Sequence, residues 1–516
     1  MQTDLLIING KCYDPGSNEM YNWIAVNKDK IIALGKGQEY MSFIDGCGEI
    51  IDAGNATVLP GFIDSHCHMV QTAINDVSLN LGEARSFDDI GYLIRTQIRK
   101  CPGQPIRGIR LDEQKLKEKK LPDRYALDRF CDNAPVWINR IEYRISMLNT
   151  YALLHYKIPY SVAGIELAAN KMPTGIIEGN ANALLRGNIL NGISSEYKLD
   201  ALKRIIPEFI KAGVTTAASM EGGYMFCDKD AEFINKYHNA VAIDLVLYFQ
   251  TTDIKKVQNM GLSRLGGSLF IDGSFGSRNA ALYEPYSDQP NNKGLLYFTQ
   301  EELNAFMLEC YECKLQTAVH VIGERAIDLA LNAHEYAVNK TGNLGLRHRL
   351  EHVELATENH RKRSKDLDLI YSMSPAYEHF WGGQDKMYEK RLGERYKLTN
   401  PFREIIDAEI LICGSSESDV TPVSPILGIH SAVNHPVEKH RVSVKEAIKM
   451  FTIDAAFALN EDLSKGCFEI GKQADIVVLD RDLLNSEKAS IIDSKVMATI
   501  KSGNILFNEI ERGGCV

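Results

Sequence analysis

The chain has 516 residues, with 68 acidic and 58 basic side chains, so its formal net charge is −10 at pH 7. Hydrophobic residues make up 45% and charged residues 24%, which is typical of a globular protein and excludes a disordered or fibrous chain. A net acidic chain without a Lys/Arg block does not suit a nucleic-acid backbone, so we expect no nucleic-acid partner.

The N-terminus and the cysteines indicate the compartment. The opening segment, MQTDLLIINGKCYD, has an early acid and no long apolar region with a cleavage site, so we expect no secretory signal. No apolar run approaches the ~20 residues that cross a bilayer, so we expect no membrane partner. The 11 cysteines are dispersed, and the single C-x-x-C at Cys310 and Cys313 lies in a helix-like pattern that favours buried thiols. We therefore predict a reducing cytoplasm.

Short apolar runs broken by Asn, Gly and Asp occur at both ends of the chain, a pattern typical of β-hairpins. These runs are residues 5–8, 23–26, 30–34, 474–480 and 496–500. We therefore predict one small β-sandwich domain assembled from both chain ends, residues 1–58 and 463–516.

Between these ends, apolar runs alternate with helical patterns. The runs predicted as buried strands are residues 62–68, 214–221, 244–250, 268–272, 317–320, 348–352, 369–374 and 410–414. Near-continuous apolar runs are expected of a parallel sheet that is covered on both faces, and they recur at about the length of a βα repeat. We therefore predict an α/β fold, a (β/α)₈ TIM barrel within residues 59–462.

One interval is too long for a βα repeat. Residues 70 to about 205 separate the first predicted barrel strand from the second, and they hold helical patterns and one further strand at 136–141. A loop of this length without its own structure would be improbable. We therefore predict an insertion over the barrel mouth, at about residues 73–205.

Two histidines end the first predicted barrel strand, in the segment PGFIDSHCH. Because residues two apart in a strand point the same way, we expect His66 and His68 to face the barrel interior, at the C-terminal strand end where barrel active sites form. Two imidazoles at this spacing can chelate zinc or a similar ion. A pair of structural core histidines is the alternative.

His320 and His352 each end a predicted strand of their own. Taken singly, either is more often a structural histidine. Four imidazoles at three C-terminal strand ends are hard to explain by packing, because each buried ring would need its own hydrogen-bond partner. The four histidines together therefore predict a metal centre.

Several segments carry a resemblance to a known family. They are VLPGFIDSHCH, LFIDGSFGSRNAALYEPY, TAVHVIGERAID, LRHRLEHVEL and GCFEIGKQADIVVLD. In this order they resemble the amidohydrolase superfamily, and within it the branch of N-substituted formamide deformylases and YtcJ-type hydrolases, sometimes called amidohydrolase family 3. The resemblance covers nearly the whole chain and implies a barrel with a β-sandwich from both termini. It says much less about the substrate.

The resemblance implies the roles of individual residues. His66 and His68 match the family's metal ligands on the first strand, and His320 and His352 match the ligands that close strands five and six. We therefore expect a divalent metal, Zn²⁺ first, as one ion or two. Iron and manganese also tolerate such ligands.

The family's last-strand carboxylate is the general base. In the segment CGSSESDVTP, alignment on Val-Thr-Pro without a gap places Glu417 at that position, whereas a shifted loop would supply Asp419. We prefer Glu417. It is one methylene longer than the Asp that is usual in the family, which changes where the base lies.

Many relatives have on strand four a Lys that can be carboxylated to bridge two metals. The aligned residue here is Ser268, which cannot do this. Glu221, at the end of the second predicted barrel strand, is placed for such a bridging role. The alternatives are a loop carboxylate paired with an Arg, and a site with a single metal.

Two arginines are candidates for contacting substrate. Relatives often carry Arg-x-Asp-Gly-His in the insertion, and this chain has Arg144 where the His would be. A permanent cation facing the pocket would favour an anionic substrate group, while an ion pair with Glu142 or Asp128 is the alternative. Arg278, after strand four, is the second candidate, for contacting substrate or stabilising the lid.

These parts predict a metal-dependent amidohydrolase that cleaves a C–N bond other than a peptide bond, in an amide of a small organic molecule. A deaminase of a cyclic amidine is the alternative enzyme. A metal-free relative that binds a ligand without turnover is the alternative of another class. The expected partner is a small-molecule substrate, and family habit suggests a homodimer.

Overall fold

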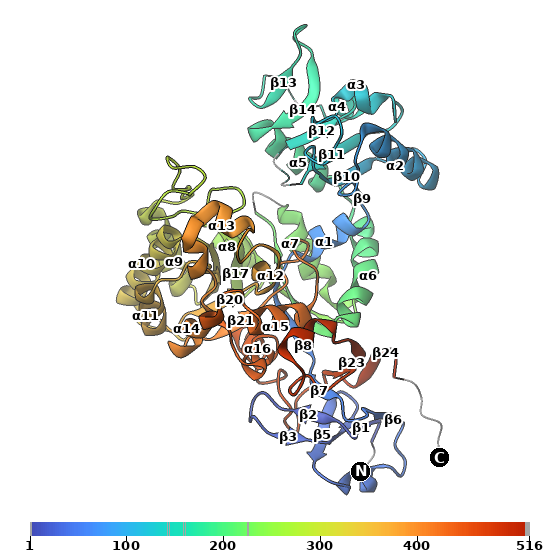
Figure 1. Ribbon diagram of the computed structural model, residues 1–516, viewed down its shortest axis with the longest axis vertical. Coiled ribbons are helices and arrows are strands. Elements are labelled where there is room, and N and C mark those ends of the chain that lie inside the picture. Colours follow the sequence, from blue (N-terminus) through green and yellow to red (C-terminus); the bar gives the residue numbers. More distant parts are fainter. Residues whose placement is uncertain are drawn as a thin grey trace. The chain divides into compact units, whose positions relative to one another are not determined.

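The computed structural model describes residues 3–141, 143, 145–157, 159, 161–223 and 227–510. The chain divides into two compact units. The barrel unit comprises Met1–Met69, Ile206–Glu221 and Ala231–Val516, and the insertion unit comprises Val70–Ile205 and Gly222–Asp230 (Figure 1).

A nearly closed barrel of parallel strands forms the centre of the barrel unit. In sheet order its strands are β8 (Phe62–Cys67), β15 (Val214–Glu221), β16 (Asp244–Phe249), β17 (Arg264–Phe270), β18 (Gln316–Val321), β19 (Arg349–His352), β20 (Ile370–Met373) and β21 (Ile412–Gly414). The two ends of this sheet meet, since Ser65 Oγ in β8 donates to the carbonyl O of Gly414 in β21 at 2.9 Å. The predicted TIM barrel and its eight strands are confirmed.

Strand β17 begins at Arg264, earlier than the predicted start at residue 268. Gly266 and Gly267 follow, with φ of +96° and +100°. A Cβ at Gly266 would lie 1.9 Å from the carbonyl O of Ala318 in β18, so the close approach of these strands requires glycine there. Two residues without side chains interrupt the apolar pattern, which is why the sequence shows only the second half of the strand.

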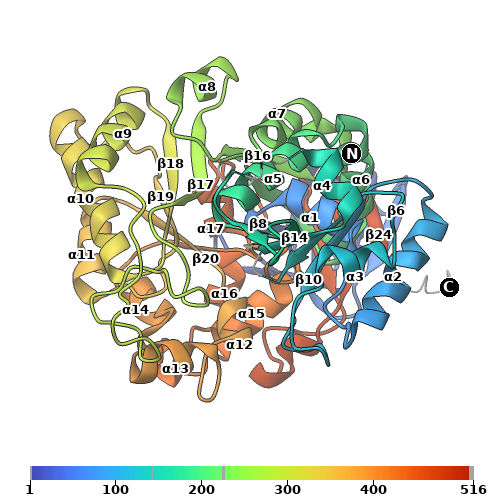
Figure 2. The ribbon, with the colours of Figure 1, turned by 90° about the horizontal axis from the view of Figure 1, so that it is seen from above.

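Helices cover the outside of the barrel. Figure 2 shows α9 (Gln300–Glu312), α10 (Glu324–Thr341) and α11 (Glu358–Asp366) on the outer side of β17, β18 and β19. The other helices of the barrel unit are α8 (Ile254–Asn259), α12 (Ala376–Phe380), α13 (Met387–Leu392), α14 (Phe402–Asp407), α15 (Pro425–Val433), α16 (Val444–Met450) and α17 (Ile453–Ala458). Among the described helices, none combines the length and the hydropathy needed to cross a bilayer.

Two further sheets in the barrel unit are built from the chain ends. The first runs β5 (Lys30–Gly35), β4 (Trp23–Asn27), β1 (Leu5–Ile8) and β6 (Glu49–Asp52). The second runs β24 (Asn504–Asn508), β23 (Val496–Lys501), β22 (Ile476–Leu479), β7 (Thr57–Pro60), β2 (Lys11–Tyr13) and β3 (Met20–Tyr21). Buried side chains of both sheets share one core, for example Ile24 and Ile476. The predicted sandwich from both termini is confirmed, while its bounds stay a prediction.

The insertion unit is richer in strands than predicted. Its sheet runs β13 (Ile165–Leu167), β14 (Pro173–Glu178), β12 (Ile145–Leu148), β11 (Val136–Arg140), β10 (Ile106–Leu111) and β9 (Leu79–Asn80). Its helices are α2 (Phe87–Lys100), α3 (Arg124–Asp128), α4 (Thr150–Tyr156) and α5 (Gly179–Asn191), and α1 (Met69–Asp76), α6 (Ser195–Lys211) and α7 (Asp228–Tyr237) contain residues of both units. The prediction of a single strand was wrong, because the others are short or interrupted by Arg, Gly or Pro.

Candidate metal centre

His66 and His68 lie at the C-terminal end of β8, both buried, with ring centroids 5.4 Å apart. His66 Nδ1 lies 2.6 Å from Glu351 Oε2, and His68 Nδ1 lies 2.9 Å from the carbonyl O of Met220. Carboxylate and carbonyl oxygens accept hydrogen bonds, so in the neutral rings Nδ1 carries the proton. Each Nε2 therefore presents a lone pair to the site.

The Glu417 carboxylate faces these two lone pairs. Its Oε2 lies 3.2 Å from His66 Nε2, and its Oε1 lies 3.5 Å from His68 Nε2. Burial raises the pKa of Glu417, but the neighbouring histidines lower it by more, so this pKa lies well below its usual range. The site thus gathers one anionic carboxylate and two nitrogen lone pairs, with ligand atoms that all lie within 4.8 Å of one another.

His320 and His352 complete a group of four imidazoles. The ring of His352 lies 5.3 Å from that of His66 and 4.5 Å from that of His320, between centroids. His320 Nε2 lies 3.1 Å from the carbonyl O of Gly273. Burial lowers the pKa of His352 to about 4 and that of His320 well below its usual value, so both rings are neutral at pH 7.

Several buried polar atoms of this group have no hydrogen-bond partner among the described residues. They are His320 Nδ1, both ring nitrogens of His352, and Glu417 Oε2. An unsatisfied buried polar atom costs about 1–3 kcal/mol, so four of them together indicate a missing ligand. Neutral imidazoles with one carboxylate are a donor set that zinc, iron and manganese accept. The residues present therefore fit a divalent cation.

Arg349 and Glu351 form a buried ion pair behind His66, and the sequence reasoning missed both. Arg349 Nε and Nη2 donate to the two carboxylate oxygens of Glu351, at 2.8 Å each. Arg349 Nη2 also donates to the carbonyl O of Ser65 and to Ser372 Oγ. Burial raises the pKa of Glu351, but Arg349 and His66 outweigh it and lower it to about 2. The pair fixes the ring of His66 and links strands β8, β19 and β20.

Strand alternation explains why these two residues were missed. Residues 349 and 351 share one face of β19, so alternation predicts His352 on the opposite face. His352 has φ of +73°, however, and this left-handed turn breaks the alternation at the strand end. The available signal was the alternation of Arg349, Glu351 and the apolar Leu350 within the segment RLEH.

Asp272 holds the loops on either side of His320. It is fully buried and accepts backbone N–H bonds from Ala281, Ile322 and Gly323, at 2.8, 2.9 and 2.8 Å. Burial raises the pKa of Asp272 to about 7. The Asp-Gly pair after β17 is thus a structural anchor beside the site.

The other predicted acids lie around the group. Glu221, the last residue of β15, is fully buried, and its Oε1 accepts from Ser219 Oγ at 2.7 Å. It is not one of the three residues whose ligand atoms converge in the described part of the chain, although its charge helps to raise the pKa of His68 against burial. Asp419 is half-buried and is likewise not one of those three residues. Ser268 lies in β17, and its side chain is outside the described part.

Of the two predicted arginines, Arg278 is described by the structure and Arg144 is not. Arg144 and its proposed partner Glu142 lie outside the described residues. The other proposed partner, Asp128, accepts from the N–H and Oγ1 of Thr150, at 2.7 and 2.6 Å. Arg278 donates through Nε and Nη2 to the Asp288 carboxylate, at 3.1 and 2.8 Å. Its role in substrate contact stays a prediction.

The chain is similar in sequence to known proteins over most of its length. The putative amidohydrolase YtcJ of Bacillus subtilis (strain 168) is 27% identical over 490 residues, which cover 89% of this chain and 91% of that protein. The N-substituted formamide deformylase of Arthrobacter pascens is 25% identical, covering 98% of each chain. The plant protein LONG AFTER FAR-RED 3 of Arabidopsis thaliana is 26% identical, covering 98% of this chain and 91% of its own.

A solved structure supports the fold. The crystal structure of an uncharacterized metal-dependent hydrolase from Pyrococcus furiosus superposes with a TM-score of 0.78 at 24% identity, covering 93% of this chain and 100% of that chain. A family model described as the amidohydrolase family matches residues 49–507, which include the barrel, the insertion and part of each terminal sheet. The chain therefore belongs to the amidohydrolase family.

Proposed function

We propose that this protein is a metal-dependent hydrolase that cleaves an amide-type C–N bond, other than a peptide bond, in a small organic molecule. The observation that carries the proposal is the convergence of the Nε2 atoms of His66 and His68 on the Glu417 carboxylate, at the C-terminal end of the barrel. The relative named as an N-substituted formamide deformylase supports an N-acyl amine as the substrate class.

The four histidines would hold the ion, and we propose Zn²⁺, with Glu221 as the bridge if two ions bind. A bound ion of this type polarises the substrate carbonyl and lowers the pKa of a water molecule towards about 7. Glu351 and the backbone of Met220 keep the Nε2 lone pairs of His66 and His68 directed at the site.

Glu417 is the proposed general base. Its carboxylate is held anionic beside the histidines, so it can accept the proton of the attacking water and return it to the leaving nitrogen. Arg144 is the residue we propose for recognising an anionic substrate group, with Arg278 as the second candidate. The proposed compartment is a reducing cytoplasm.

A substrate panel tests this function. Metal-reconstituted protein would be incubated with N-formyl, N-acetyl and longer N-acyl amines and amino acids, and with cyclic amidines. Release of the amine and the carboxylate is the expected result. Release of ammonia from cyclic amidines alone would make the protein a deaminase instead. Protein purified without chelator that contains no zinc, iron or manganese, and that is as inactive as its His320→Ala variant, would favour a metal-free binding protein.

A further inference from the structure

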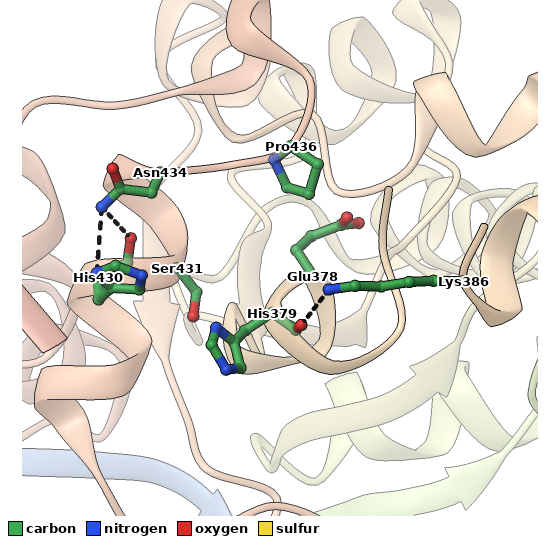
Figure 3. Close-up of a pocket in the computed structure, with 7 residues that line it drawn as sticks. All are labelled: Glu378, His379, Lys386, His430, Ser431, Asn434 and Pro436. Carbon is green, nitrogen blue, oxygen red and sulfur yellow. Dashed lines mark hydrogen bonds between the residues drawn. The ribbon is translucent and has the colours of Figure 1, made fainter. Parts of the chain in front are cut away.

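One cavity of the described structure is lined by residues other than those of the candidate metal centre. It has a volume of about 250 Å³ and lies between α12, the segment that follows it, and α15 (Figure 3). Its lining residues are Glu378, His379, Lys386, His430, Ser431, Asn434 and Pro436. None of these residues belongs to the metal centre, so the cavity is a separate candidate site.

Glu378 is the buried anchor of this cavity, with 1% of its surface exposed. Its Oε1 accepts hydrogen bonds from Thr399 Oγ1 at 2.7 Å and from Asn400 Nδ2 at 2.8 Å. His435 Nε2 lies 3.6 Å from the same oxygen. Because His435 Nδ1 accepts the N–H of Val437, the neutral ring carries its proton on Nε2, facing Glu378. Hydrogen-bond donors therefore surround Oε1.

The other oxygen of Glu378 is free for a ligand. Oε2 receives no hydrogen bond from the described residues, and it is not one of the fully enclosed polar atoms, so water can reach it. A Cβ at Gly382 would lie 1.7 Å from Oε2, so only glycine leaves room for the carboxylate there. Figure 3 shows the carboxylate between Pro436 and Lys386. A carboxylate oxygen that opens to the cavity without a protein donor suits a ligand that brings a donor, and a cationic donor forms the strongest bond to it.

Donors occupy other parts of the cavity wall. Lys386 Nζ donates to the carbonyl O of His379 at 2.5 Å and forms no ion pair within the described part of the chain. His430 Nδ1 lies 3.2 Å from Asn434 Nδ2, whose nearer acceptors are the carbonyl O atoms of His430 and Lys488. In either neutral tautomer the His430 ring carries one N–H donor. Burial lowers the pKa of His430, which keeps that ring neutral at pH 7. The cavity thus presents an acceptor at Glu378 and donors at Lys386 and His430.

We propose that this cavity binds a small zwitterion, with its ammonium group on Glu378 Oε2 and its carboxylate towards Lys386 and His430. A ligand that is only a cation would be repelled by Lys386, and a ligand that is only an anion would be repelled by the carboxylate of Glu378. A volume of about 250 Å³ leaves room for a molecule of amino-acid size. The proposal does not depend on the function proposed for the metal centre.

A chain-length series tests the proposal. Binding of the ω-amino acids from glycine to 6-aminohexanoate to the full chain would be measured by calorimetry, beside the alkylamine and the alkanoate of each length. We expect one chain length to bind best, at least about tenfold more tightly than its amine or its carboxylate alone. Equal binding of the zwitterion and its amine, or no binding in the whole series, would overturn the proposal.

Variants locate the binding. Glu378→Gln removes the buried charge and is expected to weaken binding about tenfold or more. His430→Phe keeps an aromatic ring but loses the ring N–H donor, and it serves as a second variant if Glu378→Gln does not fold. Lys386→Ala, at an exposed position, is expected to weaken binding by about two- to fivefold. The matched control is Lys397→Ala, an exposed lysine paired with Glu394 outside the cavity, which should leave binding unchanged.

One further variant separates this site from the metal centre. Glu417→Gln is expected to lose turnover but to bind the zwitterion with the affinity of the parent chain. If Glu417→Gln abolishes zwitterion binding, the ligand occupies the metal centre and the proposal is wrong. If zwitterion binding persists while no amide is hydrolysed by the parent chain, the proposed function fails and the cavity assignment stands.

Discussion

The two histidines of β8 are oriented by different kinds of group. His68 Nδ1 faces a backbone carbonyl, which no side-chain substitution can remove, whereas His66 Nδ1 faces the side chain of Glu351. Partners of this kind set the direction and basicity of a ligand ring. Of the two rings, His66 is therefore the one whose orientation a substitution can disturb.

Glu351→Gln should weaken metal binding by about 10- to 100-fold, because the amide holds His66 less firmly and no longer balances Arg349. Metal affinity would be measured by competition with a chromophoric chelator. The matched control is Glu354→Gln, another buried acid of the same segment, which bonds Tyr388 rather than an imidazole. Equal metal affinity in the Glu351→Gln variant and the parent would show that the pair has no positioning role.

Glu417→Gln should lower kcat by at least about 100-fold on any hydrolysed amide, because the amide cannot take up the proton of water. Asp419→Asn, two residues away and not one of the three residues whose ligand atoms converge in the described part of the chain, should change kcat by less than about threefold. Steady-state kinetics on both variants decides between the two acids. Full turnover by Glu417→Gln would move the base to Asp419 or elsewhere.

At this scale the sequence predicted residues that end strands and missed residues that support them. The four histidines stand out because imidazoles recur at predicted strand ends. Arg349 and Glu351 do not stand out, because charged residues in a strand are usually solvent-exposed and the turn at His352 is invisible to alternation. The role of Arg144 in substrate binding is inferred from the family resemblance alone and stays a prediction.

A second pair of histidines, His334 and His348, lies between helices α9 and α10 and strands β18 and β19. His334 of α10 lies with its Nδ1 3.0 Å from Tyr311 OH of α9, and His348, just before β19, stacks on the same tyrosine at 4.2 Å between centroids. Both rings are buried. Burial lowers the pKa of His334 to about 3 and that of His348 well below 6.5, so both are neutral in the folded chain.

This pair makes stability depend on pH. In the unfolded chain each histidine takes up a proton below about pH 6.5, but the folded chain does not, so the unfolded state binds more protons and the free energy of unfolding falls as the pH falls. For His334 the loss continues from about pH 6.5 to about pH 3. Each suppressed proton contributes up to about 1.4 kcal/mol per pH unit.

His334→Phe should reduce this slope by about one proton, at some cost in stability at pH 7 from the lost bond to Tyr311. Urea unfolding midpoints between pH 7 and 5 would measure it. The control variant is His238→Phe, at a half-buried histidine whose Nδ1 lies 3.0 Å from the carbonyl O of Asn235, and its slope is compared with that of His334→Phe. Identical slopes for His334→Phe and the parent would contradict the argument.

Elements differ in how well the sequence predicts them, for a physical reason. Barrel strands are buried on both faces and read as continuous apolar runs, and all of those predicted are present. In the insertion, β10 carries Arg107 and Arg110 among its apolar residues, and β14 begins at Pro173 and continues through Gly175. Such strands are stabilised by their neighbours in the sheet rather than by their own pattern.

The barrel and the terminal sheets are joined by a charged cluster. Asp244, the first residue of β16, bonds Lys465 and lies 3.0 Å from Lys501 Nζ, which in turn lies 3.2 Å from Asp475 Oδ1. The two lysine side chains are only 3% and 8% exposed. Their charges therefore depend on these aspartates, and the cluster couples the two parts of the barrel unit.

Asp244→Asn should lower the free energy of unfolding by about 1–3 kcal/mol, less than for a fully buried partner because Asp244 is itself 43% exposed. Asp29→Asn, which removes an exposed partner 3.7 Å from Lys30, is the control and should change it by less than about 0.5 kcal/mol. Urea unfolding compares the two variants. Equal effects would mean that the cluster does not couple the sheets to the barrel.

The barrel and the terminal sheets could be predicted from the length of the chain and from the apolar runs at its two ends. A plain barrel needs about 250 residues, so 516 residues left a large surplus to place. The apolar runs at both termini and the long interval after the first barrel strand indicated where these surplus residues lie. The internal sheet of the insertion could not be predicted, because pairing between short strands is decided by tertiary contacts.

The pairing of β7 with β22 has a consequence for biosynthesis. Leu483 N–H donates to Thr57 Oγ1 across 426 positions of sequence, and no nearer segment supplies β7 with that neighbour in the described sheet. At about 5–20 residues per second, a ribosome needs roughly 20–85 seconds to deliver the second partner after the first. Throughout that time the nascent chain exposes an unpaired strand edge, which is the kind of surface that chaperones shield and that aggregates without them.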